Sequence, residues 1–299
     1  MNPAPAGSAA VVACPLCQGE GRRLFEKNGI WIADCYSCGH RYSDYVPPVD
    51  HVQKTYDDAY FLEGGAGYPD YLAMSALMQE RGTYYAGVLR REGLVTGRVC
   101  DIGAASGSLL QGLAKEGYHC VGVEPNAKMV QAGQRASGLD LRQASLETFS
   151  PHAGELFDCL LLLQVIAHLV TPAQAVELAR RVLRSGGLVI VETWDRRSLT
   201  ARCAGRRWHE YSPPSVLQFF DRRSLDALFV SQGFAVVAHG RPPKPMQGAH
   251  FRSALRNALG ESLAVRALTG LVPDGARIPY PGDDVFWVMF RWMGQQATE

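Results

Sequence analysis

Residues 98–124, RVCDIGAASGSLLQGLAKEGYHCVGVE, decide the fold that the sequence predicts. The stretch begins with a short apolar run that stops at the small residues GAASG, positions 103–107. Small residues at such a turn let a ligand approach the backbone closely. Leu109, Leu110 and Leu113 then form the apolar face of a helix, and a second strand pattern ends at Glu124. The stretch therefore predicts one right-handed βαβ unit.

The carboxylate of Glu124 lies at the tip of the second predicted strand, about 20 residues beyond the glycine turn. That placement suits hydrogen bonds to the two hydroxyl groups of a ribose. The competing interpretation is an ordinary βαβ unit that binds no ligand, and this stretch by itself leaves it open.

Strands and helices continue to alternate on the C-terminal side. Residues 156–163 form an almost continuous apolar run, which is typical of a central parallel strand covered on both faces. The last strand is aromatic and β-branched and is expected to return antiparallel. Further strands are expected at 139–141, 188–192, 233–239 and 283–292, and helices at 126–137, 172–184 and 221–231. The predicted fold class is α/β, a doubly wound Rossmann-like sheet with ligands at the carboxyl ends of its strands.

Composition narrows the class of protein. The chain has 299 residues, of which 47% are apolar and 20% charged, enough for one large domain and a small one. The formal net charge is +1, so there is no global electrostatic reason to seek nucleic acid or an anionic membrane. No apolar run approaches the roughly 18 residues of a membrane span. We expect a cytoplasmic protein with no membrane contact.

Four of the eight cysteines form a metal-binding pattern. Cys14 and Cys17 make one CxxC pair, and Cys35 and Cys38 make a second after a gap of 17 residues. This spacing presents four thiolates tetrahedrally to zinc, and no coordination position is left open, so a structural zinc is expected. His40 is an alternative ligand. A hairpin turning at residues 28–29 between the pairs predicts a zinc ribbon over residues 14–45.

The chain is expected to divide into four parts. Residues 1–13 are expected to be a disordered tail, and residues 46–97 a linker followed by a capping helix over 70–92. Residues 98–299 form the large domain. Two long connections within it, 194–220 and 241–282, are expected to form lids, because the first interleaves aromatic and basic residues.

These pieces occur in an order that resembles a known family. Tyr60-Phe61, the 101–107 turn, Gly122-Val-Glu124-Pro125, His168, Gly186-Gly187 and the late aromatic strand resemble class I S-adenosylmethionine-dependent methyltransferases. Their seven-stranded Rossmann-like sheet is the fold that the resemblance implies. The likeness is to the subgroup with an N-terminal zinc ribbon that is related to ubiquinone-type O-methyltransferases.

The resemblance implies S-adenosylmethionine as cofactor and assigns its neighbours in this sequence. Asp101, Gly103, Ala104 and Gly107 shape the turn around the methionine part, and Glu124 with Pro125 meets the ribose. The other implied neighbours are Ser145 and Leu146 at the adenine, Leu163 and Gln164 on the opposite side, and Tyr60 and Tyr71, which could face the sulfonium by cation–π attraction. A dinucleotide is the alternative, but the turn has only Gly103 and Gly107, and Asp101 suits a cationic amino group.

This sequence departs from the family pattern at three positions. Ala105 replaces the middle glycine of the turn, which is tolerable if its φ is negative. Ala167 replaces a glutamate before His168. The lid carries Ser215-Val216 where relatives often have a histidine after two prolines. The last two departures leave the catalytic residues to be found from this chain alone.

Transfer to a hydroxyl or ammonium acceptor requires a base, and histidine is the natural one near neutral pH. His168 and His209 are the candidates, with Tyr211 or Glu210 orienting the acceptor. A packing role for either histidine stays open.

The leading hypothesis is methyl transfer to a small molecule, at oxygen rather than nitrogen or carbon, in specialised metabolism. Scattered arginine pairs keep an RNA base methyltransferase as the second hypothesis, although nucleic acid is not the expected partner. A non-catalytic cofactor-binding module with a recruiting ribbon is the third.

Overall fold

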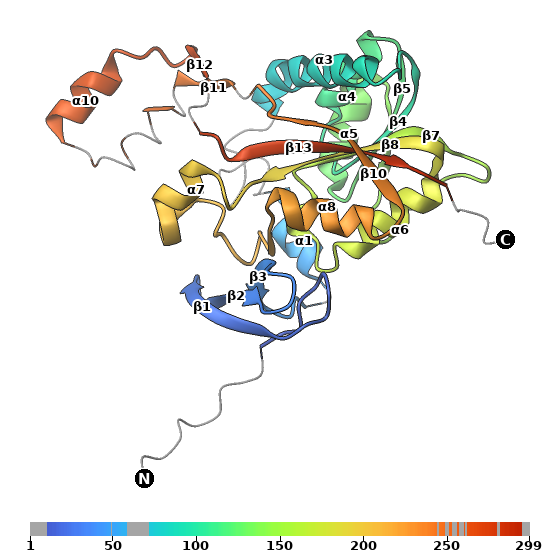
Figure 1. The fold of residues 1–299 in the computed structure, drawn as a ribbon. Helices are drawn as coiled ribbons and strands as arrows, with labels where there is room; N and C mark the ends of the chain where they lie inside the picture. Colours follow the sequence, from blue (N-terminus) through green and yellow to red (C-terminus); the bar gives the residue numbers. More distant parts are fainter. Residues whose placement is uncertain are drawn as a thin grey trace.

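The computed structural model describes residues 11–48, 50–58, 72–243, 245–248, 251–252, 256, 260, 262–279 and 282–294. Its centre is a seven-stranded sheet (Figure 1). The strands in spatial order are β10 (Phe234–Gly240), β13 (Val285–Trp292), β8 (Leu183–Trp194), β7 (Phe157–Leu163), β4 (Gly97–Ile102), β5 (Tyr118–Glu124) and β6 (Asp140–Gln143).

Strands β8, β7, β4, β5 and β6 run parallel, as the alternation of strands and helices predicts. Strand β13 is antiparallel to both of its neighbours and lies between β8 and β10. The predicted α/β class, the parallel core and the antiparallel return of the last strand are confirmed. The last strand occupies an interior position of the sheet, which explains why its side chains are almost all buried.

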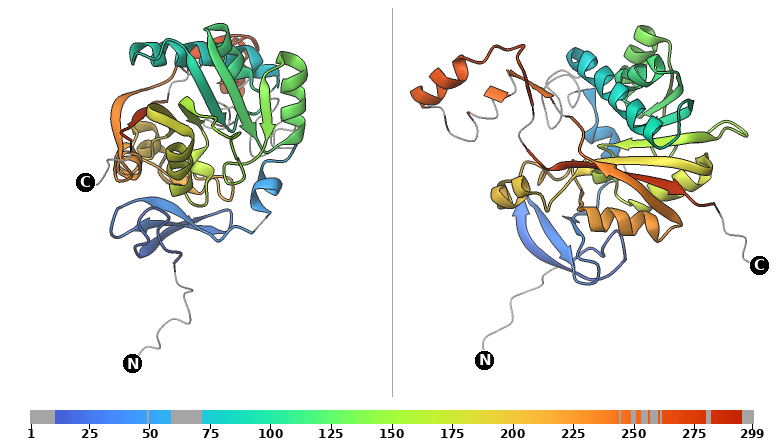
Figure 2. Two further views of the ribbon diagram at one scale, coloured as in Figure 1. Left: turned by 90° about the vertical axis from the view of Figure 1, so that its right-hand side faces the viewer. Right: turned by 45° about the horizontal axis from the view of Figure 1, so that its top comes forward.

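Helices cover both faces of the sheet (Figures 1 and 2). One face packs against α3 (Ser75–Arg91), α4 (Ser108–Lys115) and α5 (Ala127–Ser137), and the other against α6 (Ala173–Val182) and α8 (Arg222–Val230). The apolar run in β7 supplies Leu160 and Leu162 to one core and Cys159 and Leu161 to the other. A strand with two buried faces therefore reads as continuously apolar.

The N-terminal module is a second sheet of antiparallel strands, β1 (Gly21–Lys27), β2 (Ile30–Cys35) and β3 (Arg41–Asp44). Asn28 and Gly29 turn the predicted hairpin with φ of 51° and 76°, both in the left-handed region that such a turn requires. The fourth strand of this sheet, β9 (Gln218–Phe219), comes from the expected lid and pairs with β3. The module thus shares a sheet with a segment nearly 180 residues away in the sequence.

Several expected boundaries differ in the structure. Residues 1–10 lie outside the described residues, but Val12 is hydrogen-bonded to β3 through Tyr42 and Asp44, so the module begins before Cys14. The helix expected over 70–92 is a short 3-10 turn, η1 (Leu72–Met74), followed by α3. Helix α6 ends at Val182, and residues 183–187 already belong to β8, where Leu183 pairs with Phe157.

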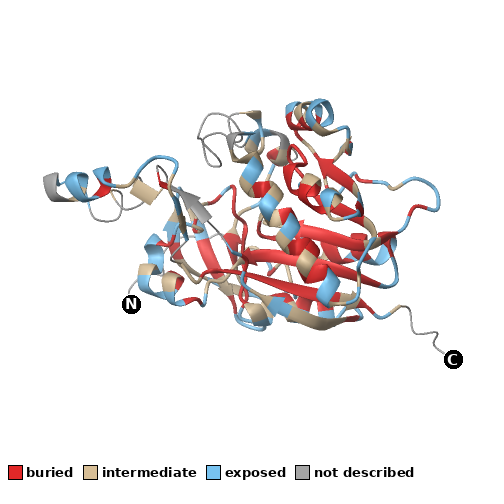
Figure 3. Cartoon of the chain, turned by 90° about the horizontal axis from the view of Figure 1, so that it is seen from above, coloured by how far each residue is buried: buried red, intermediate tan, exposed pale blue. Residues whose placement is uncertain are grey.

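The two expected lids contain regular structure. The first holds α7 (Leu199–Ala204), η3 (Gly205–Arg207) and β9, and its Trp208 and Phe220 are buried. In the second, β11 (Pro245–Gln247) pairs with β12 (Arg277–Pro279), and α10 (Leu263–Gly270) lies between them in the chain. Helix α10 lies away from the buried sheet, and its Leu268 is exposed (Figure 3). A short helix, α1 (His51–Thr55), connects the module to the large domain.

Candidate functional site

The glycine turn follows β4 at the carboxyl edge of the parallel strands. Gly103 and Gly107 have φ of +77° and +71°, and Gly107 caps α4. A Cβ atom at Gly103 would lie 2.6 Å from the Val165 side chain, so both conformation and space require glycine there. The Gly103 and Ala104 N–H groups donate to the carbonyl of Val123 in β5. These bonds fix the turn against the neighbouring strand.

Glu124 ends β5 with its carboxylate directed at this turn. It accepts hydrogen bonds from the backbone N–H of Ala105 and of Asn126, each at 2.9 Å. Burial raises the pKa of Glu124 to about 7, although both bonds favour the charged form. The turn and the acid predicted from the sequence are therefore in direct contact.

Ala105 does not have the negative φ under which alanine would be tolerable in this turn. Its φ is +48°, in the left-handed region that alanine avoids because its Cβ crowds the following carbonyl oxygen. Alanine is therefore held at a positive φ in this turn, where its N–H donates to Glu124 immediately before the chain enters α4. The turn therefore stores backbone strain at Ala105.

Asp101 is the second buried acid of the turn. Its side chain is in β4, and burial raises its pKa to about 8, with a smaller contribution from the charge of Glu124. No described residue donates a hydrogen bond to this carboxylate. An acid held in this state has a strong preference for a cationic partner.

The other predicted cofactor neighbours lie at the same sheet edge. Leu163 and Gln164 follow β7, and Pro125 follows Glu124. Ser145 and Leu146 follow β6; Ser145 bonds with Thr148, and Leu146 is buried in the core beside Phe149. Strands β7, β4, β5 and β6 are consecutive in the sheet, so the topology brings these predictions together. Tyr60 and Tyr71 lie outside the described residues.

Sequence analysis missed a buried polar network next to this edge. Glu192 of β8 is fully buried, and it accepts hydrogen bonds from Arg81 and Tyr85 of α3 and from the Gln164 side chain at 2.6 Å. Arg81 also lowers the pKa of Asp101. An acid in the otherwise apolar stretch of β8 was a usable signal, because a buried carboxylate needs a partner.

His168 lies in η2 (Ile166–His168), directly after β7. Its Nδ1 lies 2.7 Å from the carbonyl oxygen of Ser215, which can only accept, so the hydrogen is on Nδ1 and the neutral ring keeps its lone pair on Nε2. Burial lowers the pKa of His168 below its ordinary value. The ring of Tyr56 meets the imidazole edge-on at 5.6 Å. In the neutral ring, the Ser215 contact favours the tautomer with its hydrogen on Nδ1, and backbone contacts with Ser215 and Gln164 oppose the effect of burial on the pKa.

His209 lies further along the same edge, between Trp194 at the end of β8 and Asp284 before β13. The ring centroids of His209 and Trp194 are 4.5 Å apart, and Nδ1 of His209 lies 4.0 Å from Asp284 Oδ2. Asp284 is buried and accepts a hydrogen bond from Trp208 Nε1 at 2.8 Å. The His209 side chain is 50% exposed, so a solute can reach it. Glu210 lies 3.5 Å from its other ring nitrogen.

Tyr211 is directed toward the N-terminal module. Its hydroxyl oxygen accepts a hydrogen bond from Arg41 Nη1 at 2.7 Å, and its ring packs edge-on against Phe25, Trp208 and Phe219. Arg41 is itself held by a two-point ion pair with Asp34. The Tyr211 hydroxyl is therefore bonded to Arg41 of the N-terminal module.

The four N-terminal cysteines converge on one point. Their sulfur atoms lie within 4.8 Å of one another, with Cys14 and Cys38 at 3.6 Å and Cys17 and Cys35 at 3.4 Å. A tetrahedral zinc site with bonds of about 2.3 Å separates its sulfur atoms by about 3.8 Å. The cluster therefore fits a four-coordinate metal. His40 is turned away from it, and its Nε2 bonds to Gln218.

Comparison with known proteins agrees with this geometry. The sequence model of a methyltransferase domain family matches residues 74–239. The ubiquinone biosynthesis O-methyltransferase of Aromatoleum aromaticum is 33% identical over 116 residues, 36% of this chain and 48% of the relative. The enzyme of the same name from Cereibacter sphaeroides strain KD131 is 32% identical over 119 residues, 37% of this chain and 47% of the relative. The chain thus spans about half the length of these relatives.

Among solved structures, a candidate methyltransferase of Bacillus halodurans C-125 superimposes with a TM-score of 0.51 at 14% identity, covering 70% of this chain and 98% of that one. At this identity the likeness concerns the fold alone. No helix in the part of the chain that the structure describes is long and apolar enough to cross a membrane. The family match covers more than half of the chain, and we conclude that it belongs to the class I S-adenosylmethionine-dependent methyltransferases.

Proposed function

We propose that the protein transfers a methyl group from S-adenosylmethionine to a small-molecule acceptor, at an oxygen atom. The observation that carries the proposal is the contact between the left-handed 103–107 turn and the buried Glu124 carboxylate at the carboxyl edge of the sheet. The choice of oxygen is supported by the O-methyltransferases among the relatives. A role in specialised metabolism is part of the same proposal.

The charges at the site favour a cationic cofactor. Asp101, Glu124 and Glu192 are buried acids there, whereas Arg81 is the one cation that the structure describes among them. A dinucleotide would bring a pyrophosphate, and its two negative charges would face these carboxylates. S-adenosylmethionine carries an ammonium and a sulfonium group. We assign Asp101 to the ammonium group, Glu124 to the ribose hydroxyls, and Leu163 and Gln164 to the opposite wall.

Bound S-adenosylmethionine supplies an electrophilic methyl group that an acceptor displaces in line. The protein has to orient the acceptor, exclude water and remove one proton. We assign the proton to Nε2 of His168, because the Ser215 carbonyl holds the hydrogen on Nδ1. A pKa lowered by burial keeps the ring neutral and able to accept at neutral pH.

His209 is the alternative base. Its support is its exposure and its proximity to the buried Asp284 carboxylate, which would stabilise the protonated ring. The Trp194 ring beside it offers a planar apolar surface for an acceptor. We assign Tyr211 a structural role beside this surface, because its hydroxyl is bonded to Arg41.

We further propose that the four cysteines bind one structural zinc ion. Cys14, Cys17, Cys35 and Cys38 leave no open position for a reacting group. The module has only a small core of its own around Ala33 and Tyr42, so metal binding would supply much of its stability.

The reaction is tested by incubating the purified protein with methyl-labelled S-adenosylmethionine and an extract of its own host. We expect label in one or a few small molecules. Label in RNA would replace the acceptor class with a nucleic acid, and cofactor binding without transfer would leave a binding module. Binding of NAD in place of S-adenosylmethionine would overturn the proposal.

The base is tested by replacing each histidine by alanine and measuring transfer at saturating cofactor. A general base contributes about 10²–10⁴-fold to the rate. We expect His168→Ala to lose at least about 100-fold and His209→Ala to lose less. The reverse order would assign the base to His209, and near-normal rates for both variants would exclude either histidine as the base.

A further inference from the structure

We propose that the N-terminal module is a positioning element for His168, acting through residues 215–218, which we call the bridging segment. The chemical meaning of this inference rests on the proposed function, in which His168 accepts the proton. The contacts themselves are present in the structure whether or not His168 accepts the proton. They form a continuous hydrogen-bonded path from β3 to the loop that carries His168.

The first half of the path joins the module to the bridging segment. The Ser43 N–H donates to the Leu217 carbonyl at 2.8 Å, and the Ser43 hydroxyl donates to the Val216 carbonyl at 3.1 Å. Tyr42 and Gln218 face each other as paired residues of β3 and β9. The bridging segment therefore leads into a strand of the module's sheet at Gln218, and Val216 and Leu217 are hydrogen-bonded to Ser43 just before it.

The second half joins the bridging segment to the loop that carries His168. The Leu217 N–H donates to the Ala167 carbonyl at 2.9 Å, and His168 Nδ1 donates to the Ser215 carbonyl at 2.7 Å. Leu217 thus bonds to the module through its carbonyl and to the loop through its N–H. The carbonyl that selects the His168 tautomer belongs to Ser215, which directly precedes the residues that Ser43 of the module holds.

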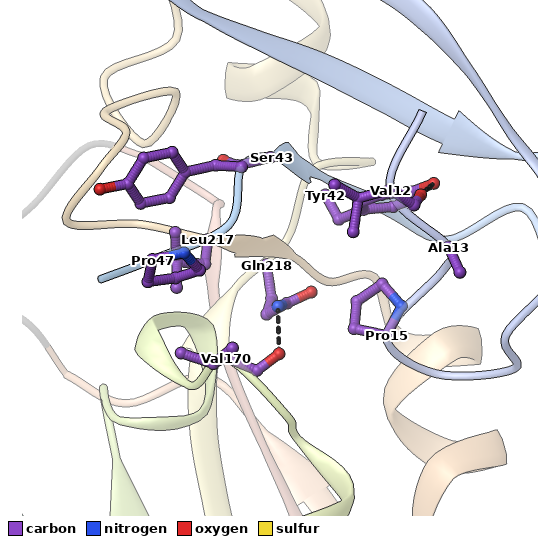
Figure 4. A pocket seen from close by; sticks show the side chains of 10 residues that line it. Val12, Ala13, Pro15, Tyr42, Ser43, Pro47, Val170, Leu217 and Gln218 are labelled. Carbon is purple, nitrogen blue, oxygen red and sulfur yellow. Dashed lines mark hydrogen bonds between the residues drawn. The ribbon is translucent and has the colours of Figure 1, made fainter. Parts of the chain in front are cut away.

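Gln218 makes a parallel connection with its side chain. Its oxygen Oε1 lies 3.0 Å from His40 Nε2, and its Nε2 donates to the Leu169 carbonyl at 2.9 Å. Gln218 is 4% exposed, so both bonds lie out of water, where a lost partner is costly. Figure 4 shows Gln218 between the module and the loop at Val170, lining a pocket of about 60 Å³.

Further contacts hold the rest of this wall. Asn28 at the hairpin turn donates to the Pro213 carbonyl at 2.8 Å, and Arg196 donates to the Gly39 carbonyl at 2.8 Å. The Tyr56 hydroxyl donates to the same Ser215 carbonyl as His168, at 3.1 Å. The module is thus hydrogen-bonded to the chain on both sides of Ser215, at Pro213 and at residues 216–217.

The cofactor turn has different supports. It is fixed by β5 and by Glu124, and the Arg81 network comes from α3. A change in the module should therefore alter the orientation of His168 and leave cofactor affinity nearly unchanged. This separation distinguishes a positioning role from general destabilisation.

The test uses Gln218→Met, which keeps the length of the side chain and removes its hydrogen bonds to His40, Leu169 and Val170. The protein is labelled with ¹⁵N-histidine, and the His168 signals are assigned by their loss in His168→Ala. Cofactor affinity is measured by calorimetry. In the native protein we expect a single tautomer with the hydrogen on Nδ1. In Gln218→Met we expect the Nδ1–H signal to shift or to divide between tautomers, with cofactor Kd within about twofold.

Gln134→Met is the matched control. The Gln134 amide also donates to a backbone carbonyl, that of Leu141 at 2.8 Å, but on α5 away from the path. It should leave the His168 signals unchanged. If Gln218→Met does not fold, Ser43→Ala removes one bond of the path and is read in the same way. Native His168 signals in a folded Gln218→Met, or in Ser43→Ala where that variant replaces it, would overturn the inference.

With the acceptor identified, the transfer rate adds a second readout. Small misplacements of a reacting group cost up to about 100-fold, and we expect kcat of Gln218→Met to fall by about tenfold with an unchanged KM for the cofactor. If the native protein binds no S-adenosylmethionine, the proposed function fails, whereas the His168 signals still decide whether the module positions this residue.

Discussion

At the residue scale, the cofactor turn combines strain and buried charge. Ala105 is held at φ +48°, and Asp101 and Glu124 are buried on the adjacent strands β4 and β5. Both features cost stability in the absence of a ligand. A bound cation would recover part of this cost. We therefore expect substitutions here to have opposite effects on stability and on cofactor binding.

Replacing Ala105 by glycine should remove the backbone strain. The left-handed conformation costs alanine about 1–2 kcal/mol, and the greater freedom of glycine in the unfolded chain offsets roughly half of this gain. We expect Ala105→Gly to be equal to or up to about 1 kcal/mol more stable than the native protein in urea unfolding. Ala105→Val, whose branched side chain tolerates this φ worst, should be less stable. Equal stability of the valine and glycine variants would contradict the observed conformation.

Asp101 should make the ligand-free protein less stable as pH rises. Its pKa of about 8 in the folded state lies well above the value of about 3.9 in an unfolded chain, so the folded protein binds more protons between these pH values. Stability therefore falls as pH increases from about 4 to 8. Asp101→Asn should be more stable than the native protein at pH 8, by at least about 1 kcal/mol, and equal near pH 4. A gain that does not depend on pH would exclude this cause.

The same group should couple cofactor binding to a proton. At pH 7 the Asp101 carboxyl is largely protonated, and an ammonium group beside it would lower its pKa. Binding should therefore release up to about one proton, and affinity should rise with pH up to about 8. Calorimetry in buffers of different ionisation enthalpy measures this release. Asp101→Asn should bind weakly and release less; release identical to that of the native protein would assign the proton to another group.

At the element scale, the contact between α3 and α4 decides where Arg81 and Tyr85 lie. A Cβ atom at Gly82 would be 2.0 Å from the Leu109 carbonyl oxygen, and one at Gly112 would be 2.0 Å from the Gln79 carbonyl oxygen. Because both obstacles are backbone atoms, only glycine allows the helices to approach this closely. The close approach brings the α3 side chains to Glu192 in the sheet.

Gly82→Ala should therefore separate the two helices. Overpacking of this kind costs about 1–3 kcal/mol, and the displaced Arg81 should weaken cofactor binding. Gly87→Ala is the matched control on the same helix, because nothing lies within 4 Å of its Cβ position. There the higher helix propensity of alanine should add about 0.5–1 kcal/mol. Urea unfolding and calorimetry compare the two, and a stabilised Gly82→Ala would contradict the packing.

At the scale of the whole molecule, the N-terminal module and the large domain share a sheet. Strand β9 directly precedes α8 of the large domain in the chain, but it pairs with β3 of the module. The module is hydrogen-bonded to the segment that contacts His168. Loss of the module's metal should therefore change the surroundings of His168 as well as the module itself.

Cys17→Ser should lose zinc and destabilise the protein by several kcal/mol, since structural zinc contributes much of the folding free energy of small modules. Metal content, thermal unfolding and the His168 signals measure this. Cys203→Ser is the control, because Cys203 is an exposed free thiol outside the cluster. It should keep its zinc and its unfolding temperature. Full zinc content in Cys17→Ser would show that the cluster is not the metal site.

The local parts of the site were predictable because their requirements lie in contiguous sequence. Gly103 and Gly107 are needed for a positive φ, Glu124 ends the strand next to them, and the CxxC pairs bring their own sulfur atoms together. Apolar periodicity likewise predicted the order of strands and helices. In each case the physical cause acts within one or two elements.

The tertiary structure alone decided the features that depend on distant segments. The pairing of β3 with β9, the bond from Arg41 to Tyr211 and the burial of Glu192 under Arg81 follow from which chain segments meet at one sheet edge. The positive φ of Ala105 belongs here too, because it occurs in a turn that is hydrogen-bonded to β5 and to Glu124. The sequence by itself thus determined the sheet, the cofactor turn and the cysteine cluster. Only the fold decided which carbonyl orients His168, because residues 47 apart must meet to form that bond.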